Sequence, residues 1–334
     1  MTTAPPYTIT PAILDLAIQI GEALGRAEAS AVGEDLHLRR INRIRSIRGS
    51  LAIEGNTLTE DEITTLLDGR PVIAPPREIR EVRNAFDAYH VFPEWDPTSE
   101  ADLLRAHEIL MSGLLDAPGR YRRGNVAVVG AGEVHHIGPP ADRVPHLMGD
   151  LLSWVGETDD HPLITSSVFH YEFEFIHPFE DGNGRMGRLW QTLMLTLTRW
   201  NPLFAWVPVE SLIYARQSEY YEAIRASSAE GESTPFITYM LEAILEALRK
   251  YHPTDQENTH VTDQVMRLLS ELRNGPRSAA DVMAALGLSH RPTFRNNYIH
   301  PALEAELVEM THPESPRARN QRYRLTARGR AVAR

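Results

Sequence analysis

One segment of the chain combines the residue types that phosphoryl or nucleotidyl transfer needs. It runs from His177 to Arg188 and reads His-Pro-Phe-Glu-Asp-Gly-Asn-Gly-Arg-Met-Gly-Arg. A histidine titrates near neutral pH and can accept a proton from a hydroxyl group, so His177 is a candidate general base. Asp181 is a hard oxygen ligand suited to Mg²⁺, which takes few protein ligands and completes its shell with phosphate oxygens and water.

The same segment predicts two helices with an anion site between them. The aromatic and apolar run at residues 168–176 has few polar positions and therefore predicts a buried helix. Pro178 and the glycines break this helix, and the pattern becomes helical again from Arg185. Backbone amides and the positive dipole end at a helix N-terminus bind anions. The residues expected to cradle phosphates there are Gly182, Asn183 and Gly184.

Two arginines in this segment strengthen the phosphate interpretation. Arg185 and Arg188 are three residues apart, so they share one helix face and can reach the same ligand. Their forked guanidinium groups match phosphate geometry. A histidine beside a proline is usually structural, and an isolated Asp-Gly-Asn-Gly run is usually a tight turn. A turn needs neither two arginines nor a buried histidine at this spacing, so the conjunction favours a site.

The composition excludes several other chemistries. Lys250 is the sole lysine, and no glycine-rich loop precedes it, so a P-loop and a protein-kinase phosphate lysine are both excluded. Arginine and backbone must therefore hold any phosphates. The absence of cysteine excludes thiol catalysis, thiolate zinc sites and disulfides.

Length and charge indicate the class of protein. A chain of 334 residues is long enough for about two domains with a substantial core. The first twenty residues hold no Lys or Arg, and no apolar run approaches the roughly 20 residues that span a membrane. These features predict a soluble cytoplasmic protein without a membrane partner. The net charge of −11 disfavours non-specific nucleic-acid binding by the whole surface.

A change in charge and a polar, proline-containing stretch near residues 252–259 predict a domain boundary. Residues 255–334 carry a net charge of about +3, while the rest is strongly acidic. Upstream, helix caps at Thr10, Thr59 and Ser99 precede apolar positions with helical spacing. We therefore expect a helical region at residues 1–98, a catalytic core at 99–251 and a third domain at 252–334.

The motif resembles the signature of the Fic family of nucleotidyltransferases, HxFx(D/E)GNGRxxR, at every specified position. The resemblance covers roughly residues 50–248 and implies an all-α Fic core. It implies transfer of AMP from ATP to a Ser, Thr or Tyr hydroxyl of a protein, possession of an adenylyltransferase (AMPylation) activity, and use of Mg²⁺. In this assignment His177 deprotonates the target and Asp181 holds Mg²⁺. Arg185 contacts the β-phosphate region and Arg188 the γ-phosphate.

A second short motif resembles the inhibitory-helix motif (S/T)xxxE(G/N) of many Fic proteins. It consists of Ser50, Glu54 and Gly55, and Ile41, Ile44 and Ile47 before it predict a helix. The resemblance implies that Glu54 pairs with Arg188 and keeps it from the γ-phosphate, so that Glu54→Gly activates the protein. The plainer alternative is a helix end with Gly55 as its cap.

A hairpin is predicted before the motif, where two β-prone runs at residues 125–129 and 133–137 flank a glycine-containing loop. In Fic proteins a flap in this position holds the target segment, which would add as a strand along the flap edge. The alternative is a plain surface hairpin. Adjacent His135 and His136 point to opposite faces of a strand, which disfavours a metal site. The residues expected to dock the target are Val126, Val128, Val134 and His136.

Three predicted helices and two short β-prone runs after residue 262 are typical of a winged helix-turn-helix domain. Arg291 and Arg295 on its third helix, with Arg317 and Arg319 on the wing, would form a DNA-binding face. The alternative is a protein-interaction or dimerisation module, so DNA and a homodimer both stay open as partners.

Other functions remain open from the sequence. The same site could remove AMP from modified proteins, with Glu54 orienting water, or the core could be the nucleotide sensor of a DNA-binding regulator. Some family members transfer UMP or phosphocholine, and the kinase-type branch has Lys where this chain has Arg185. Tyr214, Tyr220 and Tyr221 are candidates for base recognition, although core packing is the alternative for them.

Overall fold

The computed structural model describes residues 4–30, 36–130, 133–197, 201–250, 263–273, 275–288, 290–304, 307–312 and 321–332. The chain divides into two compact units, residues 1–251 and 252–334. The first unit includes both the N-terminal helices and the segment that carries the motif.

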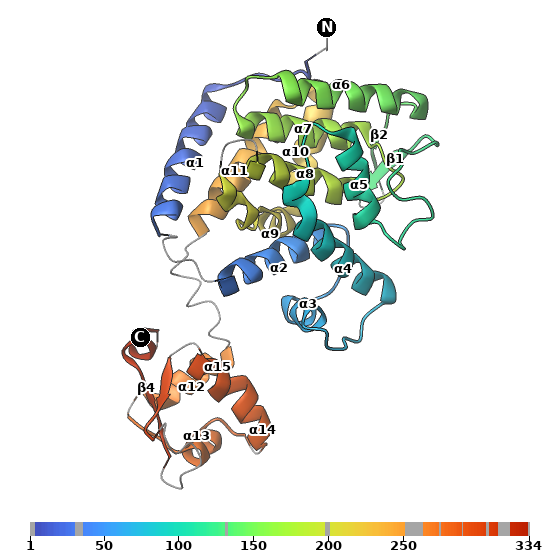
Figure 1. Cartoon of the computed structure of the whole chain (residues 1–334). Helices are drawn as coiled ribbons and strands as arrows, with labels where there is room; N and C mark the ends of the chain where they lie inside the picture. Colours follow the sequence, from blue (N-terminus) through green and yellow to red (C-terminus); the bar gives the residue numbers. More distant parts are fainter. Residues whose placement is uncertain are drawn as a thin grey trace. The chain divides into compact units, whose positions relative to one another are not determined.

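The first unit is built almost entirely from helices, which confirms the all-α prediction (Figure 1). Its long helices bury their apolar faces in one continuous core. The elements are α1 (Pro11–Ser30), α2 (Leu36–Ile53), α3 (Glu60–Leu67), α4 (Pro76–Val91), η1 (Phe92–Glu94), α5 (Glu100–Leu110), β1 (Ala127–Gly130), β2 (Glu133–Ile137), η2 (Ala141–Arg143), α6 (Val144–Glu157), α7 (Pro162–Ile176), α8 (Asn183–Leu197), η3 (Pro202–Ala205), α9 (Val209–Ala215), α10 (Gln217–Glu230) and α11 (Thr234–Lys250).

Helices α7 and α8 form the centre of this unit (Figure 1). Helix α7 begins at Pro162, six residues before the run that predicted it, and its side chains are buried along most of its length. Helix α6 covers one side of α7, α11 packs on another, and α1 packs along α11. The loop between α7 and α8 carries the motif. Both ends of this loop are therefore anchored by helices that pack in the core.

The predicted caps fix where several helices begin. Thr10 accepts a bond from the backbone of Ile13 at 3.2 Å, Thr59 forms a complete capping box, and Ser99 accepts from Asp102. The sequence Thr234-Pro235 also predicts a cap at Thr234, which is wrong by one residue, because α11 begins at Thr234 itself and the carbonyl of Ser233 accepts its first bond at 2.9 Å. Caps are local, so the sequence predicts them to within a residue.

The hairpin forms where the sequence predicts it. Val128 lies opposite His136, and Val129 lies opposite Val134, with an irregularity in the register between Val128 and Val129. Val126 precedes β1 and accepts a backbone bond from Gly138 at 3.1 Å. The four residues expected to dock a target therefore belong to this hairpin and its base.

The second unit contains helices followed by two short strands, in the order that the sequence predicted, around a small core of its own. Its third helix is irregular, since Pro301 has no N–H to donate and a π-helical segment precedes it. The elements are α12 (Asp263–Leu272), α13 (Ala279–Ala285), α14 (Arg291–Phe294), η5 (Arg295–Ile299), α15 (His300–Glu304), β3 (Val308–Met310), β4 (Tyr323–Leu325) and α16 (Ala327–Val332). Strands β3 and β4 are antiparallel.

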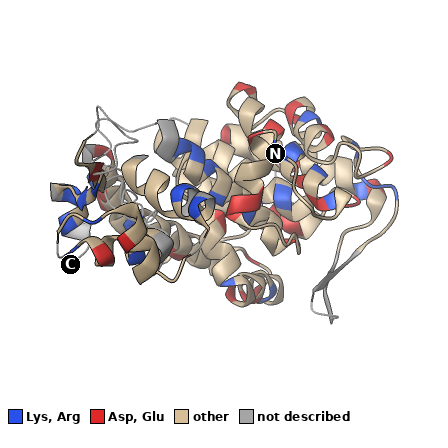
Figure 2. Ribbon diagram, turned by 90° about the horizontal axis from the view of Figure 1, so that it is seen from below, with Lys and Arg blue, Asp and Glu red and all other residues tan. Residues whose placement is uncertain are grey.

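Arginines recur along the second unit, where they appear as blue segments in Figure 2. Arg291 and Arg295 are exposed on α14 and η5, while Arg317 and Arg319 lie outside the described residues. Among the helices of the described ranges, none combines the length and apolar character needed to span a bilayer.

Candidate active site

His177 ends α7 in a strained backbone conformation. Its φ of 50° and ψ of 61° lie in the left-handed region, and it is the single described non-glycine residue with a positive φ. This conformation costs a histidine roughly 1–2 kcal/mol, so the surrounding structure must hold it. Its backbone N–H still bonds to Phe173 at 2.9 Å. The loop therefore leaves the helix sharply at the candidate base.

Arg122 supplies that hold. It follows α5, and although it is far from the motif in sequence its residue is only 6% exposed. Its guanidinium donates to four backbone carbonyls, and its own backbone N–H donates to Pro178 at 2.9 Å. The four acceptors are the oxygens of Gly124, Pro139, Ile176 and His177, at 2.8, 2.6, 3.2 and 2.7 Å. The side chain of Arg122 thus connects the residues that flank the hairpin to the backbone of His177, the candidate general base.

The motif loop is closed by its own side chains. Asn183 Oδ1 accepts from the backbone of Phe179 at 2.9 Å, and Asn183 Nδ2 donates back to the same residue at 2.9 Å. The side chain expected near phosphates is therefore used within the loop, while its backbone begins α8. Phe179 is fully buried and stacks on His107 at a ring distance of 3.7 Å.

Two positions in the loop require glycine. Gly182 has a φ of +86°, and a Cβ there would lie 2.7 Å from the sulfur of Met111. A Cβ on Gly184 would overlap Oε1 of Glu54 and lie 3.0 Å from Nη1 of Arg188. The absence of a side chain at Gly184 therefore lets charged groups converge on the start of α8.

His107 supports Asp181 from α5. Its Nδ1 accepts from the backbone of Gly119 at 2.9 Å, so in the neutral ring Nε2 carries the hydrogen and donates to the carbonyl of Asp181 at 3.0 Å. Burial lowers the pKa of His107 from 6.5 to about 4.

This buried ring should make the stability of the protein depend on pH. The unfolded chain binds a proton near pH 6.5 and the folded one only near pH 4, so stability is present above pH 6.5 and lost as the pH falls toward 4. We expect urea unfolding of His107→Gln to lose about 2 kcal/mol less between pH 7 and pH 5 than the wild type. The exposed His146→Gln is the control, and an equal pH dependence in all three proteins would contradict the prediction.

Four charged side chains form a closed ring beside the loop. Arg77 Nη2 donates to Asp181 Oδ2 at 2.9 Å, and Arg77 Nε donates to Glu81 Oε1 at 3.3 Å. Arg185 Nη1 donates to the same Glu81 oxygen at 3.3 Å, and Arg185 Nη2 donates to Asp181 Oδ1 at 3.0 Å. Asn56, just past the inhibitory motif, donates to Glu81 Oε2 at 2.9 Å. Helix α4 thus holds both Arg185 and Asp181.

Asp181 fits Mg²⁺ as a single protein ligand. Its side chain is 38% exposed, and Mg²⁺ commonly binds one or two carboxylates while phosphates and water complete its shell. The described residues contain no cluster of three or more His, Asp or Glu side chains that could hold a metal without a nucleotide. An ion at Asp181 Oδ2 would compete with the guanidinium of Arg77, which donates to that oxygen.

Removal of Arg77 should therefore ease metal binding. We expect Arg77→Met, in a Glu54→Gly background, to lower about two- to fivefold the Mg²⁺ concentration needed for ATP binding, since an exposed ion pair is worth at most about 1 kcal/mol. Isothermal titration calorimetry at several Mg²⁺ concentrations measures this without turnover. Arg83→Met, an exposed arginine on the same helix, is the control. An unchanged or greater Mg²⁺ requirement would show that Arg77 does not compete with the ion.

Glu54 and Arg188 lie in contact. Arg188 Nη2 donates to Glu54 Oε1 at 2.8 Å, and the guanidinium also donates to the hydroxyl and carbonyl of Ser50 at 3.1 and 3.0 Å. The side chain of Arg188 is 1% exposed and that of Glu54 is 32% exposed. Gly55 has a φ of +91° and ends α2, as the helix-end interpretation also required. The inhibitory motif is therefore both a helix end and a partner of Arg188.

Helix α2 is fixed to the core by its contact with α9. A Cβ on Gly49 would lie 2.6 Å from the backbone of Glu210, so α2 and α9 touch backbone to backbone. The guanidinium of Arg43 lies over the ring of Tyr89 at 5.0 Å, and the Tyr89 hydroxyl donates to Glu210 at 2.9 Å. Burial raises the pKa of Glu210. These contacts hold the C-terminal part of α2 in place, and Glu54 directly follows this helix.

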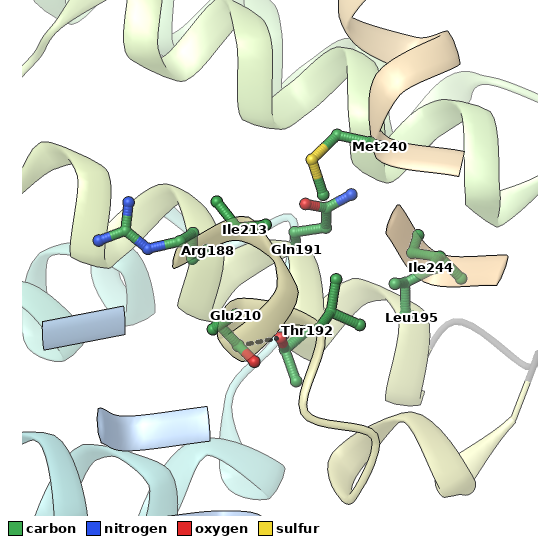
Figure 3. A pocket seen from close by; sticks show the side chains of 9 residues that line it. Arg188, Gln191, Thr192, Leu195, Glu210, Ile213, Met240 and Ile244 are labelled. Atoms are coloured by element: carbon green, nitrogen blue, oxygen red, sulfur yellow. Dashed lines mark hydrogen bonds between the residues drawn. The ribbon is translucent and has the colours of Figure 1, made fainter. Parts of the chain in front are cut away.

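A small cavity lies behind Arg188 and is not the candidate nucleotide site. Figure 3 shows the guanidinium of Arg188 pointing away from the apolar side chains, and Thr192 bonded to Glu210 at 3.2 Å. Arg188 is the one lining residue from the predicted site. The lining residues are Arg188, Gln191, Thr192, Leu195, Val209, Glu210, Ile213, Met240 and Ile244. The cavity is a packing gap between α8, α9 and α11.

Two family models match the chain. Residues 97–195 match the Fic/DOC family, and residues 263–326 match the domain described as "Filamentation induced by cAMP protein Fic-like, C-terminal domain". The crystal structure of a Fic family protein from Desulfovibrio desulfuricans G20 is 53% identical, with a TM-score of 0.73 over 97% of this chain and 99% of that one. The chain belongs to the Fic family.

Curated relatives of this Fic chain carry enzyme names. It is 28% identical over 216 residues to "Protein adenylyltransferase fic-1" of Caenorhabditis elegans, covering 60% of this chain and 40% of that protein. It is 32% identical over 145 residues to "Probable protein adenylyltransferase aq_aa38" of Aquifex aeolicus, covering 42% and 43%. The chain thus spans less than half the length of these relatives. A Fic-1 structure from C. elegans, 20% identical with a TM-score of 0.58, shares the fold.

The structure brings the predicted residues of the motif and the inhibitory segment together, and it adds four that the sequence reasoning missed. Arg77, Glu81, His107 and Arg122 contact the motif from positions 55 to 104 residues away. None belongs to a local pattern. Of the three tyrosines considered for base recognition, Tyr220 is buried in the core and Tyr214 is exposed under Arg48.

Proposed function

We propose that this Fic protein transfers AMP from ATP to a hydroxyl group of a protein side chain, and that Glu54 inhibits the transfer. The observation that supports this proposal best is the arrangement of the motif. His177 and Asp181 lie on the loop that leads into α8, and the two arginines in the first turns of α8 are buried. Nη1 of Arg188 and Nε of Arg185 are buried and find no hydrogen-bond partner among the described residues. Buried donors of this kind indicate a missing acceptor, and a phosphate would supply it. The names of the curated relatives support the same activity.

The residues divide the work as follows. His177 accepts the proton of the target hydroxyl, whose oxygen then forms a bond to the α-phosphorus. The bond from that phosphorus to the bridging oxygen breaks, and pyrophosphate leaves with the electron pair. Arg185 and Arg188 bind the β- and γ-phosphates, and the backbone amide at Gly184 stabilises the negative charge. The amide of Gly182, which was also expected to bind phosphate, donates to Asp181 Oδ1 at 2.6 Å. Mg²⁺ bound at Asp181 would neutralise phosphate charge.

The hairpin is the proposed docking place for the target. A peptide that adds to its edge would gain main-chain bonds. Arg122 donates both to Pro139 at the foot of this hairpin and to the carbonyl of His177. The same side chain therefore supports the proposed docking segment and the candidate general base.

The activity is tested by label transfer in the Glu54→Gly background. Label from ATP marked at the α-phosphate should reach protein, label at the γ-phosphate should not, and Glu54→Gly/His177→Ala should transfer neither. Label from the γ-phosphate would establish a kinase instead. If no label transfers but AMP leaves a previously modified protein, the site removes AMP rather than adding it.

A further inference from the structure

Glu174 is a buried carboxylate that the proposed reaction does not use. It lies on α7 one turn before His177, and its side chain is 10% exposed. Buried carboxylates are rare unless they are paired or functional. Its position beside the candidate base therefore needs an explanation.

The two oxygens of Glu174 face two different parts of the site. Oε2 lies 3.9 Å from Nδ1 of His177. Oε1 faces the start of α8, because a Cβ on Gly184 would lie 3.4 Å from it and 3.0 Å from Nη1 of Arg188. Oε1 of Glu54 reaches the same point. Glu174 thus stands between the base and the arginine that Glu54 holds.

The geometry assigns each nitrogen of His177 a task. Nδ1 is buried, so Nε2 is the nitrogen that can meet a target hydroxyl. When Nε2 accepts the proton the ring becomes a cation, and its Nδ1–H then faces Glu174. An anion at this place favours the cation and raises the basicity of Nε2. The 3.9 Å separation exceeds a hydrogen bond, but such contacts often shorten once substrate binds.

We propose that Glu174 is a positioning residue for the AMP transfer, which holds Nδ1–H of His177 and stabilises its protonated ring. The inference rests on the proposed function only in naming the reaction, since the effect on the ring exists without ATP. Glu174 also couples the base to the inhibitory contact, because Arg188 stabilises its anion while Glu54 opposes it.

The charged and titratable groups around Glu174 support this role. They are Arg188 on α8, Glu54 after α2, Tyr220 and Tyr221 on α10, His170 on α7 and His177 itself. Burial raises the pKa of Glu174 to about 7, with Glu54 adding to the rise and with Arg188 and a bond from Tyr220 opposing it. Glu174 therefore changes charge near neutral pH, and the charge states of Glu174 and its neighbour His177 must be measured together.

The chain offers a matched control in Glu172. It lies on the same helix, and burial also raises its pKa to about 7. Glu174 precedes His177 by three residues and lies 3.9 Å from its Nδ1, whereas Glu172 precedes it by five residues, which is a different face of a helix. If only the loss of charge on α7 mattered, Glu172→Gln and Glu174→Gln would have the same effect. If Glu174 positions His177, Glu174→Gln alone would change the properties of His177.

The first measurement is the pKa of His177 by NMR in the full chain without ATP. Its ring signal is identified by its loss in His177→Gln. We expect Glu174→Gln to lower this pKa by about one pH unit, Glu172→Gln to leave it unchanged, and Glu174→Asp to fall between. An unchanged pKa in Glu174→Gln, or an equal fall in Glu172→Gln, overturns the proposal. Because no turnover is needed, this result stands even if AMP transfer fails.

The second measurement follows transfer against pH in the Glu54→Gly background. Glu174→Gln should move the acidic limb of kcat/KM to lower pH by the same interval and lower kcat about tenfold, because a weaker base removes the proton less effectively. The KM for ATP should change less than kcat. A loss of activity with an unmoved limb would mean that Glu174 serves folding or Arg188 instead, and would overturn the proposal. If Glu54→Gly transfers nothing, the proposed function fails and the NMR result alone decides the role of Glu174.

Discussion

Glu54→Gly should raise AMP transfer by tens of fold over the wild type. Removal of one partner from a buried ion pair costs roughly 3–5 kcal/mol. Because the side chain of Glu54 is 32% exposed, we take about half of that free energy for its contact with Arg188. At about 1.4 kcal/mol per tenfold, half still corresponds to a factor in the tens. The gain is expected because Arg188, released from the Glu54 carboxylate although still bonded to the Ser50 carbonyl, can bind the γ-phosphate. It is measured as the initial rate of transfer of α-phosphate label at fixed ATP and Mg²⁺.

Two further variants separate charge from backbone effects. Glu54→Gln keeps the length of the side chain and the end of α2 but removes the charge, so it should activate nearly as well. Glu60→Gln removes a surface carboxylate that pairs with Arg45 at 3.5 Å and should leave the rate unchanged. Equal rates in wild type, Glu54→Gly and Glu54→Gln would show that the contact between Glu54 and Arg188 does not limit the reaction.

Arg122→Met should remove both stability and activity. The substitution leaves one buried and three partly buried backbone carbonyls without their donor, and an unpaired buried group costs about 1–3 kcal/mol. Partial relaxation and water reduce the sum, so we expect a loss of about 3–5 kcal/mol in the free energy of unfolding. At temperatures where the variant stays folded, transfer in the Glu54→Gly background should still fall about a hundredfold, because His177 loses its support.

The neighbouring arginine gives the control. Arg123 is exposed, and Arg123→Met should change neither urea unfolding nor the rate. If Arg122→Met unfolds at the same urea concentration as Arg123→Met, or keeps the full rate of transfer, the hydrogen bonds of Arg122 contribute neither to stability nor to activity.

Much of this architecture could be predicted because its signals are local. The caps at Thr10, Thr59 and Ser99 are read within one turn of each helix, and the break between α7 and α8 follows from Pro178 and the glycines. The glutamate expected near Arg188 is found 2.8 Å from it, although 134 residues separate the two. That expectation came from a family motif, not from the physics of the sequence.

The residues that support the site could not be predicted. Arg122, His107 and Glu81 act through contacts that exist only once distant helices pack together, and each looks like an ordinary residue in its own helix or loop. Asn183 shows the converse. The sequence placed it among phosphate-binding residues, but its side chain bonds to Phe179 and closes the loop. Local pattern identifies the chemistry of such a site, and tertiary packing decides which side chains are left to perform it.

The contact between Glu54 and Arg188 is made within one chain. Its equilibrium is therefore unimolecular, and dilution does not shift it as it would an inhibitor on a separate protein. If this contact inhibits as proposed, only molecules with Arg188 released bind ATP fully, so the apparent affinity for ATP would fall as the fraction of such molecules falls. A cell with more copies of the protein would gain activity in simple proportion to their number, while the energy charge of that cell, acting through ATP at Arg188, would determine how much of each copy is at work.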